Sequence, residues 1–168
     1  FIYNATEKIF VTVELINKFD TLKTICFSQS TEFATKLFEA INKDYQIKNN
    51  TKKEICTVYH SKLLSRPLIN PQTGEYYTYG VGKKKGQIKT FGQSSLREIA
   101  INAIINNEVR IISTASSLDK GFDVKDIKLG IVNSNTSNFN QRKQRRGRTE
   151  RIDPLDIDGI VLFINIYL

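Results

Sequence analysis

The 168-residue sequence contains no methionine and no tryptophan, and it has one histidine, two cysteines and three prolines. Without a methionine the chain cannot start at a natural initiation codon, so we expect it to be a piece of a larger protein. Two cysteines, with no spaced group of histidines and cysteines, predict neither a disulfide framework nor a zinc site. Cys26 and Cys56 lie in apolar runs typical of buried thiols. A reducing, intracellular location, cytoplasmic or nuclear, fits this use of cysteine best.

No apolar run reaches membrane-spanning length, and no charged-then-apolar leader stands at the start. We therefore expect no membrane partner. With 40 % hydrophobic and 25 % charged residues, the composition is that of an ordinary globular domain, and the length is enough to bury a real core. The net charge of +8 favours polyanionic partners such as nucleic acid, although many basic proteins never bind it.

Apolar periodicity predicts alternating helices and strands. Helices are expected over residues 4–19, from Ser30 to Ile41, and from Ser95 onward. Ser95 and Glu98 have the spacing of a capping box, and Asn4 and Glu7 have the same spacing at the start of the first helix. Strands are expected over residues 23–28, 54–59, 109–113, 128–132 and 159–167, the last as a continuous apolar run buried on both faces. Residues 43–53 read as a polar loop, and a helix is expected to begin near Asn138. This order predicts an α/β fold: an open, mostly parallel sheet with helices on both faces.

Residues 65–93 interrupt this order. They hold two prolines, several glycines, a cluster of tyrosines and the basic run Lys83, Lys84 and Lys85. We predict an inserted β-hairpin whose arms are residues 68–69 and 76–79. The run from Gly80 to Gly86 superficially resembles a phosphate-binding loop, but its spacing fails. A basic, aromatic hairpin suits nucleic acid through charge and stacking, and an exposed insertion without a ligand is an equally open alternative.

A basic segment near the end of the chain carries the most specific pattern. It reads Gln-Arg-x-Gly-Arg-x-x-Arg from Gln144, with arginines at Arg145, Arg148 and Arg151. Arginines spaced three apart share one face of a helical turn, so their guanidinium groups can converge on one anion. The alternative is a solvated basic helix face.

Two upstream segments combine a strand with small polar residues. Residues 113–123 contain Thr114, Gly121 and Asp123, and residues 23–30 contain Ser28 and Gln29 directly after a strand. Small polar residues after a buried strand lie at the carboxyl edge of a sheet, where open α/β sheets bind ligands. The alternatives are that Gly121 only permits a turn, Asp123 only caps one, and Ser28 only precedes a capped helix.

In their order and spacing these segments resemble motifs IV, V and VI of the superfamily 2 helicases, which lie on the second RecA-like domain of that family. The resemblance covers about residues 22–151. It implies a RecA-like fold, with Arg148 and Arg151 as finger arginines at the γ-phosphate of ATP. It further implies that Gln144, Arg145, Gly121 and Asp123 lie at the nucleotide, and that Ser28, Gln29 and Thr114 contact nucleic acid. Lys83, Lys84 and Lys85 would add to these contacts through their charge, in a hairpin longer than the usual connection of the family.

The same resemblance implies ATP and Mg²⁺ bound mainly by a preceding RecA-like domain, because this sequence has no Walker A loop and no acidic magnesium motif. The chain alone is then not expected to hydrolyse ATP. Gln144 in place of histidine, and Asp119-Lys120 in place of arginine before the glycine, favour DNA over RNA helicases. The alternative from another class is a catalytically inactive RecA-like domain that serves as a nucleic-acid or protein binding platform.

Overall fold

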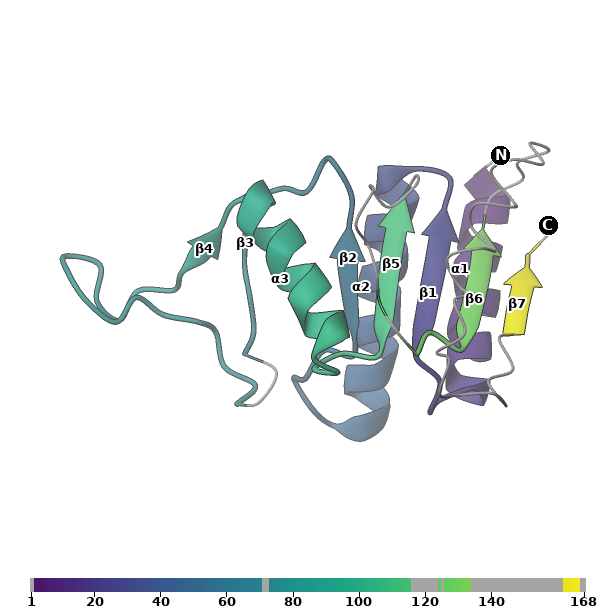
Figure 1. Cartoon of the computed structure of the whole chain (residues 1–168), viewed down its shortest axis with the longest axis horizontal. Helices are drawn as coiled ribbons and strands as arrows, with labels where there is room; N and C mark the ends of the chain where they lie inside the picture. Colours follow the sequence, from purple (N-terminus) through teal and green to yellow (C-terminus); the bar gives the residue numbers. More distant parts are fainter. Residues whose placement is uncertain (1, 71–72, 116–123, 125, 134–161, 167–168) are drawn as a thin grey trace.

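The computed structural model describes residues 2–70, 73–115, 124, 126–133 and 162–166. Five parallel strands form one sheet in the order β2-β5-β1-β6-β7. Their bounds are β1 Thr24–Ser28, β2 Cys56–Tyr59, β5 Ile111–Ala115, β6 Leu129–Asn133 and β7 Leu162–Asn165. All five arrowheads in Figure 1 point the same way, so the carboxyl ends share one edge of the sheet. The predicted α/β fold with a mostly parallel sheet is confirmed.

Three helices cover the two faces of this sheet: α1 Ile2–Lys18, α2 Thr31–Asn49 and α3 Gln93–Ile105. In Figure 1, α1 and α2 lie behind the sheet and α3 lies in front of it. Alternate strand residues supply the two cores, because successive side chains of a strand point to opposite faces. Cys26 and Ile131 pack with α1 and α2, whereas Ile25 and Ile112 pack with α3.

The start of α2 follows its sequence signal. Ser30 has an extended backbone, and its hydroxyl accepts a hydrogen bond from the Phe33 amide at 3.1 Å, as a helix cap should. Residues 43–53 are not the predicted loop, however, because α2 continues to Asn49 and ends where Asn50 adopts a left-handed conformation with φ +46°. Its last two turns expose polar side chains and carry the ion pair between Lys48 and Asp44. Their composition is that of a solvated helix face.

Two other helix starts differ from the prediction. Helix α1 already includes Asn4, so Asn4 is not its cap. Helix α3 begins at Gln93 after the cap residue Gly92, which makes no side-chain capping bond, and Ser95 lies inside the first turn. Apolar spacing predicts an inner stripe of Leu96, Ile99, Ala100, Ala103 and Ile104, and of these all but the half-buried Ile99 are buried. The strand near the end of the chain is also less enclosed than predicted: β7 is an edge strand with half-buried side chains.

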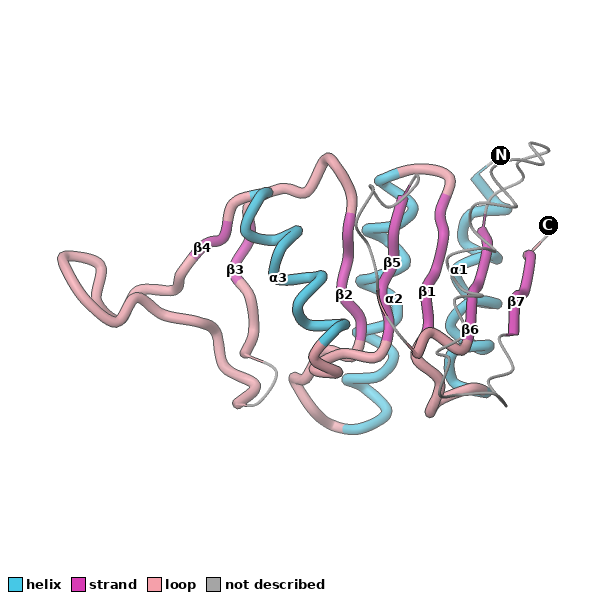
Figure 2. The backbone as a smooth tube through the Cα atoms, in the orientation of Figure 1, coloured by secondary structure: helices cyan, strands magenta, loops and turns pink. Residues whose placement is uncertain are grey.

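The interruption at residues 66–91 is an arm that projects from the β2 side of the sheet (Figures 1 and 2). At its base β3 Arg66–Pro67 pairs antiparallel with β4 Thr90–Phe91. Farther out, Ile69 pairs with Tyr76 and Thr78 pairs with Ile88. The predicted β-hairpin is therefore present, and a second turn carries the chain back to α3. No described helix is long and apolar enough to cross a membrane.

Candidate nucleic-acid interface at the carboxyl edge of the sheet

Polar side chains lie at the carboxyl ends of four adjacent strands: Tyr59, Ser28 and Asn133 are the last residues of β2, β1 and β6, and Thr114 is the last but one of β5. In the parallel register Tyr59 stands opposite Thr114, and Ser28 stands opposite both Ala115 and Asn133. Strands β5 and β6 both neighbour β1, and the chain crosses over β1 to pass from one to the other. A crevice for ligands is expected at such a carboxyl edge.

Thr114 is fully buried, and its hydroxyl has no hydrogen-bond partner within the described part of the chain. Its neighbour Ser113 points to the other face of the sheet, where its hydroxyl donates to the Ala34 carbonyl at 2.9 Å. Thr114 therefore lies on the α3 face. A buried hydroxyl without a partner costs about 1–3 kcal/mol, and such groups are uncommon enough to need an explanation.

Ser28 and Asn133 also carry buried polar atoms without a partner among the described residues, on the face of the sheet that α1 and α2 cover. These atoms are the Ser28 hydroxyl and the Asn133 amide nitrogen. The Asn133 oxygen lies 2.9 Å from the Thr12 hydroxyl, which lies 2.7 Å from the Lys8 carbonyl. A hydroxyl has one hydrogen and can donate to only one of these oxygens. Whichever way the Asn133 amide is turned, one of its polar atoms stays unpaired.

Gln29 follows Ser28 and is exposed in the turn that leads into α2. Helices α2 and α3 both begin at this edge, because each is followed by a parallel strand and runs opposite to it (Figure 1). Their amino-terminal dipole ends make the edge favourable for anions. The structure therefore brings Ser28, Gln29 and Thr114 to one edge, as the sequence predicts.

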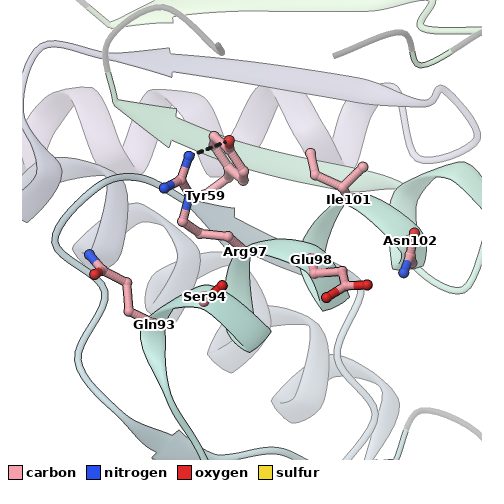
Figure 3. A pocket seen from close by; sticks show the side chains of 7 residues that line it. All are labelled: Tyr59, Gln93, Ser94, Arg97, Glu98, Ile101 and Asn102. Carbon is pink, nitrogen blue, oxygen red and sulfur yellow. Dashed lines mark hydrogen bonds between the residues drawn. The ribbon is translucent and has the colours of Figure 1, made fainter. Parts of the chain in front are cut away.

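Sequence analysis missed the pocket beside Tyr59, which is shown in Figure 3. Its volume is about 340 Å³, and the start of α3 forms most of its wall. A guanidinium nitrogen of Arg97 donates to the Tyr59 hydroxyl at 2.8 Å, and the guanidinium carbon lies 5.0 Å from the centre of that ring. Arg97 and Tyr59 are 38 positions apart, so no local pattern pairs them.

His60 has a structural environment. Its Nδ1 accepts from the Lys62 amide at 3.2 Å, so the proton sits on Nε2, which donates to the Thr35 hydroxyl at 2.8 Å. Thr35 in turn donates to the Thr31 carbonyl at 3.0 Å, which completes the chain. Burial lowers the pKa of His60 from its ordinary value of 6.5. Neutral His60 thus holds the turn after β2 against α2.

The three predicted lysines lie far from the sheet edge, in the outer turn of the arm. Lys83, Lys84 and Lys85 are exposed, and Gly82 and Gly86 on either side take positive φ values of +79° and +83°. The Gly86 amide donates to the Tyr79 carbonyl at 2.8 Å, which closes the turn. This segment is a hairpin turn, and it does not join a strand to a helix as a phosphate-binding loop does.

The remaining predicted residues, Gln144, Arg145, Arg148, Arg151, Gly121 and Asp123, lie outside the described residues. Their segments follow β5, which ends at Ala115, and β6, which ends at Asn133. Both therefore leave the sheet at its carboxyl edge. Among the described residues, no three His, Cys, Asp or Glu side chains gather as a metal site.

No family model matches the sequence, and no curated protein matches it. The fold, in contrast, matches solved structures. One is the Mycobacterium smegmatis helicase Lhr bound to ssDNA and AMP-PNP, with a TM-score of 0.61 and 16 % identity over 94 % of this chain. Another is a Saccharomyces cerevisiae Dbp5 variant bound to a Gle1 variant and IP6, with a TM-score of 0.60 and 15 % identity over 98 % of this chain.

The fold is that of a RecA-like helicase domain. The similarity covers 16 % of the Lhr chain and 33 % of the Dbp5 chain, so this chain spans a third or less of each protein. The identities are low, and the likeness therefore describes the fold and not the residues of a site.

Proposed function

We propose that this RecA-like domain is the second motor domain of an ATP-dependent superfamily 2 helicase or translocase, and that its nucleic acid is DNA. One observation carries the proposal. The buried hydroxyls of Ser28 and Thr114 lack partners at one sheet edge, in the two segments that resemble motifs IV and V. A partner for these groups must come from outside the described residues, and phosphate oxygens accept hydrogen bonds from hydroxyls.

Nucleic acid would cross the carboxyl edge in this arrangement. Ser28 and Thr114 would donate to its phosphates, and Gln29 would contact them from the exposed turn. Arg97 lies beside Thr114's neighbour Tyr59 and would add a positive charge to the same path. Contacts of this kind position the backbone without reading its sequence.

ATP would be held with Mg²⁺ between the preceding RecA-like domain and this one, and it would supply the γ-phosphoryl group for transfer to water. This domain would form one side of the nucleotide site. Residues 121–123 follow β5 in the chain and residues 144–151 follow β6, and both strands end at the carboxyl edge of the sheet. Gln144, Arg145, Gly121 and Asp123 would lie at the nucleotide. Arg148 and Arg151 would stabilise negative charge on the γ-phosphate. Closing the two domains would move their nucleic-acid contacts relative to each other.

The preference for DNA rests on sequence alone. Gln144 stands where many RNA helicases have histidine, and Lys120 stands where they carry arginine. Competition between DNA and RNA oligonucleotides of one sequence tests this point directly.

The motor role is tested by nucleic-acid-stimulated ATPase activity in the longest native form of the protein, beside the 168-residue chain. We expect activity in the long form and none in the chain alone. Arg148→Ala in the long form should lower the ATPase rate by about 10³- to 10⁵-fold and leave nucleic-acid binding intact. Arg146→Ala, a neighbouring arginine outside the motif, is the matched control and should retain activity.

Two results would count against this role. Equal loss of ATPase and of nucleic-acid binding in Arg148→Ala would remove the finger assignment. No ATPase in either form, with salt-sensitive binding retained, would instead identify a binding platform of RecA-like fold.

A further inference from the structure

The arm, residues 66–91, is the most exposed and the most basic part of the described chain. It carries five cationic side chains and one carboxylate, a net charge of +4. Every residue from Val81 to Thr90 is exposed, including four lysines at positions 83, 84, 85 and 89. The outer part of the arm, residues 81–90, adds nothing to the core, since all of its residues are exposed. Its charge is complementary to a polyanion.

Aromatic rings alternate with these charges along the arm. Tyr76 and Tyr77 remain 49 % and 38 % exposed. Tyr77 packs edge-on against Phe91, with the ring centres 5.8 Å apart. The ammonium groups of Lys84 and Lys89 lie 5.7 Å and 4.8 Å from the ring centres of Tyr79 and Phe91. Aromatic rings and lysines on one arm are the combination that single-stranded nucleic acid uses, since its bases can stack while its phosphates meet positive charge.

The rings also discriminate between single and double strands. Base faces inside a duplex are already stacked on each other, so an exposed tyrosine can take only a base that has left the stack. Lysines alone would serve any polyanion, including duplex nucleic acid or an acidic protein. The tyrosines therefore favour a single strand as the occupant.

The base of the arm is joined firmly to the domain. Leu68 is buried in the core, and the guanidinium of Arg66 lies 4.7 Å from the ring centre of Phe38 on α2. Arg66 also lies 3.9 Å from the carboxylate of Glu54. Gln93, just after the arm, donates to the Ser61 carbonyl just before it. A ligand on the arm would consequently move with the sheet.

The arm also leaves the domain at the edge described above. It starts a few residues after Tyr59 at the end of β2, and it returns at Gly92, the cap residue of α3. Figure 1 shows β3 and β4 next to α3, on the side away from β2. A strand that crosses Ser28 and Thr114 and continues past Tyr59 reaches the arm next.

We propose that the arm binds single-stranded nucleic acid and extends the path that begins at the carboxyl edge of the sheet. Lys83, Lys84 and Lys85 contact phosphates, and Tyr76 stacks on a base. This inference rests on the proposed function, because it takes the carboxyl edge as the start of the path.

The test is fluorescence anisotropy with the full 168-residue chain. The probes are an oligothymidylate of about 20 nucleotides and a duplex of equal length, titrated between about 50 and 200 mM salt. Each phosphate contact on a single strand contributes about 0.7 to the slope of log K against log salt. Substituting all three lysines (Lys83→Gln, Lys84→Gln, Lys85→Gln) should therefore reduce the slope by about 2 and weaken binding about 10- to 100-fold at 100 mM salt.

A matched control removes the same charge elsewhere. Lys18, Lys43 and Lys48 are exposed in the second halves of α1 and α2, which run away from the carboxyl edge of the sheet. Their triple substitution by glutamine gives the same net charge and should leave the slope within about 0.5 of the wild type. An equal fall in both triple variants would mean that net charge alone matters, and it would overturn the proposal.

Tyr76 supplies the second readout. Tyr76→Leu keeps an apolar side chain but loses the ring, and should weaken oligothymidylate binding about 5- to 150-fold without changing duplex binding. Tyr76→Phe should restore the affinity. Equal affinity in the leucine and phenylalanine variants would overturn the stacking role, as would equal losses on single strand and duplex.

The outcomes separate this inference from the proposed function. If the arm variants bind as the wild type does while Thr114→Val is impaired, the arm proposal fails and the sheet-edge interface stands. If the wild-type chain binds neither probe, both fail.

Discussion

Replacing Thr114 by valine should make the protein more stable and, at the same time, weaken its binding of nucleic acid. Valine has nearly the same shape as threonine and lacks the hydroxyl, which is buried without a partner among the described residues. Removing it recovers a desolvation cost of about 1–3 kcal/mol. For a chain of this size, each 1 kcal/mol corresponds to about 2–4 °C in Tm, so a rise of roughly 2–12 °C is expected.

The effect on binding has the opposite sign. A hydrogen bond to a charged group contributes about 1.5–3 kcal/mol. Its loss corresponds to an affinity about 10- to 150-fold lower for a single-stranded oligonucleotide. Thermal unfolding and anisotropy on the same sample measure the two quantities.

The adjacent residue provides the control. The Ser113 hydroxyl is equally buried but donates to the Ala34 carbonyl at 2.9 Å. Ser113→Ala should therefore lower stability by about 1 kcal/mol and leave the affinity unchanged. If Thr114→Val lowered the Tm as Ser113→Ala does, and kept full affinity, the Thr114 hydroxyl would be an ordinary structural group and the reasoning would be wrong.

Two further predictions concern the support of β2. Asn42 is buried on α2, and its side-chain amide accepts from the backbone amides of Ile55 and Cys56 and donates to the Cys56 carbonyl, each at 3.0 Å. Asn42→Ala should therefore lower the free energy of unfolding in urea by about 2–4 kcal/mol. Asn49 is exposed on the same helix, and Asn49→Ala should lower it by less than about 1 kcal/mol. A loss in Asn42→Ala no larger than in Asn49→Ala would show that these bonds do not hold β2. The pKa of His60 is lowered in the folded state, so the unfolded chain takes up the proton first and stability falls as the pH drops below about 6.5. His60→Gln should therefore reduce the change in the urea midpoint between about pH 7.5 and pH 5. An unchanged pH dependence in this variant would contradict the argument.

Local signals predicted those parts of the fold that local physics decides. Ser30 caps α2 because its hydroxyl reaches an amide three residues away, and both groups lie within one turn. The turn in residues 70–75 and the pairing of Ile69 with Tyr76 likewise depend on near neighbours. The polar end of α2 was wrongly expected to be a loop because composition cannot separate a solvated helix face from a coil. What favours the helix includes the long-range bonds of Asn42 to the chain at Ile55 and Cys56.

The sequence likewise predicted some residues of the candidate site and missed others. Sequence placed Ser28, Gln29 and Thr114 at strand ends, and it singled out the arm and the arginine segment by their residue types. The Arg97–Tyr59 pair and the unpaired Asn133 had no such signal, since their partners and neighbours come from other strands and helices.

By itself the sequence determined where the main helices and strands lie and that β1, β5 and β6 are buried, because the apolar pattern reflects which side chains leave water. Only the tertiary structure decided the order β2-β5-β1-β6-β7 and the edge position of β7. Strands pair through backbone hydrogen bonds that every residue can make, so the sequence carries little information about which strands are neighbours. That order is what sets Thr114 beside Tyr59 and Ser28 beside Asn133, and so brings residues of four separate segments to one candidate site.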